Sequence, residues 1–110
     1  MKRGEVWWIT NDGATGCEQF GRRPAIIVSN NACNAYSPTI QMIPLTASRK
    51  KPMPTHVRFP LNGRMSTALC EQICCVDKGR VDRYAGELDE ETMRQVEKAM
   101  RIQLGMEAFG

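Results

Sequence analysis

Short strand-like runs separated by turn residues fill most of this chain, and a helical pattern appears only near its end. Three runs are rich in β-branched and aromatic residues and are bounded by Gly, Asn or Pro: Gly4–Thr10, Pro24–Ser29 and Thr39–Thr46. Shorter candidates follow at Thr55–Phe59, Ser66–Glu71 and Gln72–Val76. Six or seven short strands ahead of one helix predict a mainly β fold, a small and strongly bent antiparallel sheet or barrel closed by that helix.

Two prolines and two connections refine this prediction. Pro24 stands first in its run, where a missing N–H costs little, whereas Pro44 lies inside its run and predicts an edge strand or a bulge. Asn30–Pro38 is polar and turn-rich, so we expect an irregular connection there. Asp77–Arg80 forms the last turn and leads into no more than a brief extended piece.

The helix is predicted over about residues 89–105. Asp89 is a good N-cap, the glutamates after it suit the positive end of the helix dipole, and Leu88 with Met93 forms a hydrophobic staple. The apolar stripe comprises Met93, Val96, Met100 and Leu104, and the polar side offers the pairs Glu90–Arg94 and Glu97–Arg101. This helix should pack against the β body.

Length and charge bound the class of protein. A chain of 110 residues fits one domain, residues 1–110, with one modest core. No apolar run approaches the ~20 residues of a membrane span, and the first residues lack the apolar core of a signal peptide, so we expect a cytoplasmic protein. Residues 1–86 hold twelve Lys or Arg against six Asp or Glu, whereas residues 87–110 hold three against six. A basic body suggests a polyanionic partner, although ordinary surface charge would give a similar balance.

Five cysteines indicate thiols rather than a disulfide framework, because the number is odd and two of them are adjacent: Cys17, Cys33, Cys70, Cys74 and Cys75. A zinc site built from Cys70, Cys74 or Cys75, and His56 is the alternative. No CxxC or HxxxH spacing supports it, so we predict reduced cysteines and no metal site.

The residues that suit phosphate chemistry lie where loops meet strands. Asn11–Arg22 is a glycine-containing loop that we expect to be mobile, and it contains Glu18 and leads into Arg23. A 2′-hydroxyl can cleave RNA without metal if the protein stabilises charge on the phosphate, which suits Arg23 together with the strand-end hydroxyl of Thr46. By themselves, a solvated arginine and a structural threonine explain these two residues equally well.

An ordered set of motifs changes that balance. The stretches are Gly4–Trp8, Glu18–Gln19, Gly21–Val28, Leu45–Ala47, Pro54–Val57, Glu71–Ile73 and Asp77–Lys78. In this order, from Lys2 to about Leu104, they resemble the MazF/PemK-type toxins of bacterial toxin–antitoxin pairs. The resemblance implies an SH3-like small barrel and a homodimer. It also implies metal-independent, sequence-specific cleavage of single-stranded mRNA without a cofactor, leaving 2′,3′-cyclic phosphate (or 3′-phosphate) and 5′-hydroxyl ends.

The same resemblance assigns the site. The arginine of the family's G-x-R-P motif falls on Arg23 and the threonine of its I/L-T-A motif on Thr46, which makes them the catalytic pair. We place at the RNA groove Glu18, Gln19, Phe20, Arg22, Arg49, Lys50, Lys51 and His56, although a structural place below the groove also explains His56. Phe20 stands where relatives commonly carry Gly, and the loop lacks the His that some relatives use for proton transfer. An acidic antitoxin is the implied partner.

Two other functions fit a barrel of this kind. A CcdB-like toxin poisons DNA gyrase by binding it through C-terminal residues, but the tail Met106–Gly110 lacks that family's terminal Trp-Gly-Ile. A non-catalytic RNA-binding barrel would bind RNA without creating new 5′-hydroxyl ends. The presence of both Arg23 and Thr46 favours the ribonuclease.

Overall fold

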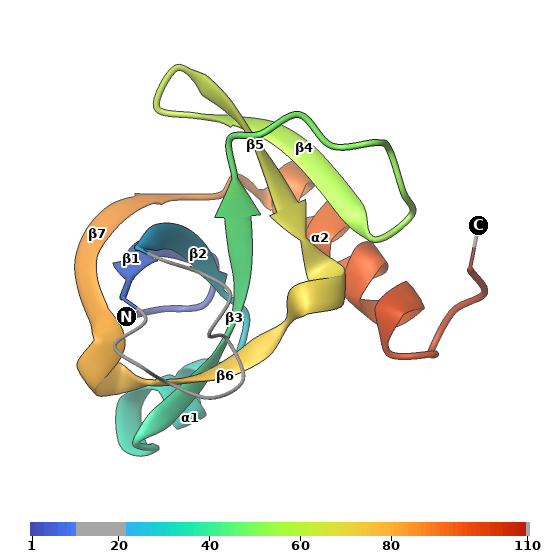
Figure 1. Ribbon diagram of the computed structural model, residues 1–110. Coiled ribbons are helices and arrows are strands. Elements are labelled where there is room, and N and C mark those ends of the chain that lie inside the picture. Colours follow the sequence, from blue (N-terminus) through green and yellow to red (C-terminus); the bar gives the residue numbers. More distant parts are fainter. Residues whose placement is uncertain (11–21, 110) are drawn as a thin grey trace.

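The computed structural model describes residues 1–10 and 22–109, which form a curled antiparallel sheet with a helix packed against it (Figure 1). The described strands are β1 (Glu5–Ile9), β2 (Arg23–Ile27), β3 (Thr39–Thr46), β4 (His56–Leu61), β5 (Arg64–Leu69), β6 (Cys74–Asp77) and β7 (Val81–Glu87). The helices are α1 (Asn31–Tyr36) and α2 (Glu90–Gln103), and short 3₁₀ turns span Cys70–Gln72 and Lys78–Arg80. The predicted mainly β class with an amphipathic C-terminal helix is confirmed.

Strand β3 is the centre of the sheet, whose order is β4-β5-β3-β2-β1-β7 with β6 also paired to β3. One edge of β3 pairs with β2. The other edge pairs with β6 over Thr39–Met42 and then with β5 at Leu45 and Thr46. Because of this change of partner, β7, β1, β2, β3 and β6 curl into a ring, while the β4–β5 hairpin lies toward α2 (Figure 1).

Pro44 lies inside this central strand and is fully buried, so the expectation of an edge strand was wrong. The residue stands between Met42, the last partner of β6, and Leu45, the first partner of β5. Neither β5 nor β6 pairs with β3 at Pro44, so the missing N–H of this proline removes no hydrogen bond to either of these strands. This explains why a central strand tolerates proline here.

The two faces of the sheet bury two apolar clusters. The cluster around Ile26 and Ile43 packs against Val96 and Ala99 of α2. The cluster around Ile27 and Met42 fills the inside of the ring. Because successive side chains of a strand point to opposite faces, the unbroken apolar run of β2 supplies both clusters, as expected for a strand buried on both sides.

Helix α2 begins where predicted. Asp89 caps it, since its Oδ1 accepts a hydrogen bond of 2.7 Å from the Thr92 amide. The apolar stripe of the helix is shorter than predicted, because its last predicted member, Leu104, is the C-cap residue and is 58% exposed. The predicted i,i+4 ion pairs do not form either. The pairs observed are Arg94–Glu91, Arg101–Glu107 and Arg3–Glu97, of which the last joins the helix to the N-terminus.

Two segments are more regular than predicted. Asn31–Tyr36 is a short helix, because the Asn30 side chain accepts a hydrogen bond from the Cys33 amide and caps it. Val81–Glu87 is a full strand rather than a brief extended piece, and it pairs with β1. None of the helices in residues 1–10 and 22–109 is long and apolar enough to cross a membrane.

Replacement of Asp89 by Ala should lower the stability of the fold in a pH-dependent manner. The Thr92 amide and hydroxyl, which hydrogen-bond to Asp89, lower the pKa of its carboxyl. The stabilisation by this carboxylate is therefore full at neutral pH and is lost as the pH falls through the lowered pKa. Urea unfolding at neutral and acid pH should show a deficit for Asp89→Ala that shrinks in acid. The deficit should be smaller for Asp89→Ser, which keeps a capping oxygen.

Candidate functional site

Arg23 and Thr46 lie at the same end of two neighbouring strands. The register of β2 and β3 pairs Ile27 with Met42 and Ala25 with Pro44. Arg23, the first residue of β2, and Thr46, the last residue of β3, each lie two residues beyond the last pair between these two strands, Ala25 and Pro44. The Thr46 hydroxyl accepts a hydrogen bond of 3.1 Å from the Ser48 amide, so its own proton points elsewhere and can be donated.

Arg22, immediately before Arg23, is held by two neighbours. Its guanidinium carbon lies 4.6 Å from the ring centroid of Trp8, which is within the range of a cation–π contact. Its Nη2 donates to Asp82 of β7 at 2.7 Å. The contacts fix the chain at the start of β2, where the candidate catalytic arginine stands.

A pocket of about 200 Å³ lies beside Thr46. Its lining residues come from the ends of β1, β2 and β3, from the β4–β5 hairpin and from β7: Trp8, Pro24, Leu45, Thr46, Ala47, Leu61, Asn62, Arg64, Ser66 and Ala85. The pocket therefore adjoins the Arg23–Thr46 end of the sheet.

The β4–β5 hairpin that borders this pocket turns at Asn62 and Gly63. Both residues have positive φ, 52° and 79°, which is typical of a two-residue Asn-Gly turn. The Asn62 amide donates to the Ala85 carbonyl of β7 at 2.7 Å. Next to it, a Cβ at Gly86 would lie 3.2 Å from Leu61, so the hairpin tip and β7 are in close contact.

His56 joins the barrel to the loop between β3 and β4, which carries Arg49, Lys50 and Lys51 and is called the basic loop below. Its Nε2 lies 2.8 Å from Glu71 Oε2 and its Nδ1 lies 3.1 Å from the Lys51 carbonyl oxygen. The side chain is only 9% exposed. Both ring nitrogens therefore contact oxygen atoms of neighbouring residues. This geometry supports the structural interpretation of His56.

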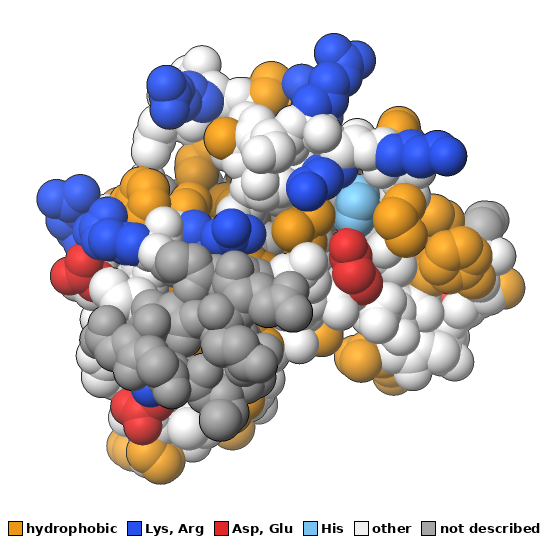
Figure 2. All heavy atoms as spheres, viewed as in Figure 1, with side chains coloured by type: hydrophobic (Ala, Val, Ile, Leu, Met, Phe, Trp, Pro, Cys, Tyr) orange, Lys and Arg blue, Asp and Glu red, His pale blue; other side chains and the backbone are white. Residues whose placement is uncertain are grey.

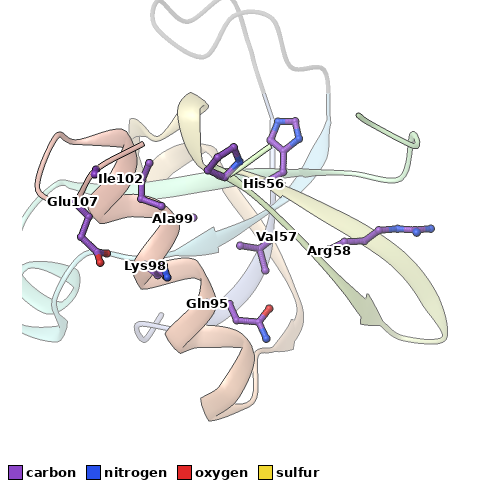
Figure 3. A pocket seen from close by; sticks show the side chains of 10 residues that line it. His56, Val57, Arg58, Gln95, Lys98, Ala99, Ile102 and Glu107 are labelled. Carbon is purple, nitrogen blue, oxygen red and sulfur yellow. The ribbon is translucent and has the colours of Figure 1, made fainter. Parts of the chain in front are cut away.

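A second groove lies between β4 and α2, and His56 is one of the residues that line it. Figure 3 shows His56, Val57 and Arg58 on the strand and Gln95, Lys98, Ala99 and Ile102 on the helix. Val57 points toward the helix, whereas Arg58 extends away from it. This groove lies apart from the pocket beside Thr46, with which it shares no lining residue.

Most of the Lys and Arg side chains visible in Figure 2 lie in the upper half of that face, with His56 among them. The sequence-predicted cations Arg22, Arg49, Lys50 and Lys51 are all exposed. Two further arginines are exposed: Arg64, which lines the pocket, and Arg83 of β7, which pairs with Trp8. Of the other predicted groove residues, Glu18, Gln19 and Phe20 lie outside the described part of the chain, as does most of the predicted loop 11–22.

The prediction that the cysteines are free thiols is met only in part by the structure. Cys33, Cys70 and Cys75 are free, but Cys74 takes part in a disulfide. Burial, with a smaller effect of Glu71, raises the pKa of Cys70 to about 12, so its thiol stays protonated and is a poor nucleophile. Among the residues that the structure describes, no three Cys, His, Asp or Glu side chains group as a metal site would require.

Trp8, Asn62, Arg64 and Ser66 were not predicted as part of the site. For the hairpin a signal was present, because Asn-Gly between two apolar runs is typical of a tight β-hairpin. Trp7 and Trp8 face opposite sides of β1, as successive residues of a strand do. Trp7 packs edge-on against Tyr84 with the ring centroids 5.7 Å apart, whereas Trp8 lines the pocket.

Comparison with known proteins gives a consistent result. Residues 2–104 match the family described as PemK-like, MazF-like toxin of type II toxin–antitoxin system. The chain is 35% identical to Endoribonuclease EndoA of Bacillus subtilis, covering 99% of this chain and 98% of that protein. It is 34% identical to Endoribonuclease MazF of Staphylococcus saprophyticus, with 96% and 92% covered.

Solved structures show the same fold. A mycobacterial endoribonuclease, solved in complex with its cognate antitoxin, superposes with a TM-score of 0.82 at 27% identity over 97% of each chain. MazF from Deinococcus radiodurans gives a TM-score of 0.82 at 28% identity, with 96% of this chain and 97% of that chain covered.

Proposed function

The chain belongs to the PemK-like, MazF-like toxins of type II toxin–antitoxin systems, and we propose that it is the endoribonuclease toxin of such a pair, cleaving single-stranded mRNA in the cytoplasm. The observation that carries the proposal is the position of Arg23 and Thr46 at one end of adjacent strands, bordered by a pocket and by exposed cations. Cleavage at specific sequences would stop translation and growth.

The reaction uses the RNA itself as the nucleophile. The 2′-oxygen attacks the adjacent phosphorus, the bond from phosphorus to the 5′-oxygen breaks, and the products are a 2′,3′-cyclic phosphate (or, after hydrolysis, a 3′-phosphate) and a 5′-hydroxyl. One proton leaves the 2′-hydroxyl and one reaches the departing 5′-oxygen. No metal or cofactor is needed for these steps, because the protein's part is alignment and stabilisation of charge.

Arg23 and Thr46 both stabilise the negative charge on the phosphate, each through its own hydrogen bonds. The guanidinium of Arg23 is permanently charged and can donate to two phosphate oxygens at once. The Thr46 hydroxyl, whose oxygen already accepts from Ser48, donates its proton to a phosphate oxygen and orients the group. Both interactions strengthen as charge grows on the pentacoordinate phosphorus, so they favour the transition state over the bound substrate.

Three partners follow from this function. The exposed cations Arg49, Lys50 and Lys51 attract the RNA backbone, and the Glu18–Phe20 segment contributes to the groove. An acidic antitoxin covers the same basic surface and blocks it, in line with the mycobacterial relative solved with its cognate antitoxin. A homodimer is the assembly proposed for the active toxin.

Purified Arg23→Ala and Thr46→Ala proteins should bind RNA but cleave it roughly 10²–10³-fold more slowly, the usual cost of removing one donor to a transition-state oxyanion. The measurement is single-turnover cleavage of a mixed-sequence RNA in EDTA, with mapping of the new 5′-hydroxyl ends. Arg94→Ala, an exposed arginine on α2, is the matched control and should cleave like the parent.

Three results would argue against this assignment. They are unchanged cleavage by both variants, loss of all cleavage in EDTA, and toxicity that survives Arg23→Ala but requires the last three residues. The last result would favour the gyrase-binding alternative.

The basic loop should control the salt dependence of RNA binding. Each phosphate contact to single-stranded RNA contributes a slope of about −0.7 in a plot of log affinity against log salt concentration. Joint replacement of Lys50 and Lys51 by Ala should therefore make the slope shallower by about 1.4 if both lysines contact phosphates. Fluorescence anisotropy with an uncleavable 2′-deoxy substrate measures it, and an unchanged slope would place the loop outside the groove.

A further inference from the structure

The pocket beside Thr46 contains polar groups without partners in the described structure. The side chain of Arg64 makes no hydrogen bond or ion pair with the described residues, and neither does the hydroxyl of Ser66. Asn62 uses its amide nitrogen on the Ala85 carbonyl, which leaves its side-chain oxygen as an acceptor. Donors and one acceptor are thus available at the edge of a site that is otherwise apolar.

The remaining lining suits a flat ring. Trp8, Leu45, Leu61 and Ala85 supply apolar surface. Its volume of about 200 Å³ is below the ~300–1,000 Å³ of pockets that hold drug-sized ligands, which leaves room for one ring system. Arg22 contacts the Trp8 ring but does not line the pocket, so ring surface remains to contact a ligand.

Hydrogen bonds and strand pairing hold the elements that line the pocket. The hairpin tip is fixed to β7 by the Asn62–Ala85 hydrogen bond and by the contact of Leu61 with Gly86. Trp8 pairs within the sheet with Pro24 on one side and Arg83 on the other. Polar groups on fixed strands and a tight turn are better placed for selective hydrogen bonding than groups on a loose loop.

We infer that this pocket holds the base of a nucleotide that adjoins the cleaved phosphate and that it selects guanine or uracil. The inference rests on the proposed function, because the ligand is RNA and Thr46, which borders the pocket, contacts the phosphate.

The choice of base follows from donors and acceptors. Guanine and uracil share a carbonyl next to a ring N–H, whereas adenine and cytosine present an amino group next to an unprotonated nitrogen. Arg64 only donates, so it pairs with the carbonyl and opposes the amino group. The Asn62 side-chain oxygen accepts from the ring N–H, and Ser66 can serve either as donor or as acceptor. Trp8 provides the ring surface on which the base packs.

Sequencing of cleavage sites in a random RNA pool tests the inference. The wild-type protein should cut with guanine or uracil enriched at one of the two positions that flank the cleaved bond. Arg64→Met should still cut but with discrimination at that position reduced by roughly 5–150-fold, the usual worth of one good pair of base contacts. Arg64→Glu should shift the preference toward adenine or cytosine, and Ser66→Ala should weaken it.

Arg58→Met is the matched control, since Arg58 is also an exposed arginine of the hairpin but lines the other groove. It should retain the wild-type preference. Circular dichroism and thermal melting confirm that each variant folds.

Each other outcome has a distinct meaning. The inference is refuted if the wild type cuts without preferring guanine or uracil at either position, or if Arg64→Met keeps the full preference. It is also refuted if folded Arg64→Met cuts nothing, because Arg64 would then act on the phosphate. Failure of the wild type to cut any RNA would refute the proposed function itself, and the inference with it.

Discussion

The division of one edge of β3 between two partners is the constraint on which the rest of the structure depends. If β6 or β5 paired with β3 along its whole length, the sheet would stay open and its two faces would not close over separate clusters. The buried proline between the two paired segments makes the interruption inexpensive. The curl that results also leaves the last residue of β3 at a rim, beside the first residue of β2. Fold and candidate site thus have a common origin in this backbone arrangement.

Much of the fold could be predicted because its signals are local. The β-branched run of β2, the cap at Asp89 and the bounds of β3 follow from neighbours along the chain. The wrong predictions concern which residues form ion pairs and which segments pair as strands. Glu97 pairs with Arg3 rather than Arg101, since the N-terminus comes within reach of the helix only after folding. The seven-residue β7 has few buried side chains and is stabilised by pairing with β1, which no local pattern reveals.

The candidate site divides in the same way. Arg23 and Thr46 are predicted as the catalytic pair because their motifs resemble those of a family, and the structure places them at the same end of two adjacent strands. The pocket beside them could not, because it requires the hairpin tip to meet β7 and Trp8 to approach from β1. His56 shows a third case. Its residue type suggested chemistry, but two acceptors on a nearly buried ring favour attachment of the basic loop instead.

The tight Asn62–Gly63 turn has a consequence for how such a protein can diversify. The turn lies at an exposed tip, where insertions are tolerated better than in packed strands, yet its neighbours border the pocket. Lengthening or shortening this hairpin would change the shape and polarity of the pocket while leaving β2, β3 and both apolar clusters intact. Selection could therefore change the lining of this pocket through a few codons at one tip, while the strands that carry Arg23 and Thr46 stay unchanged.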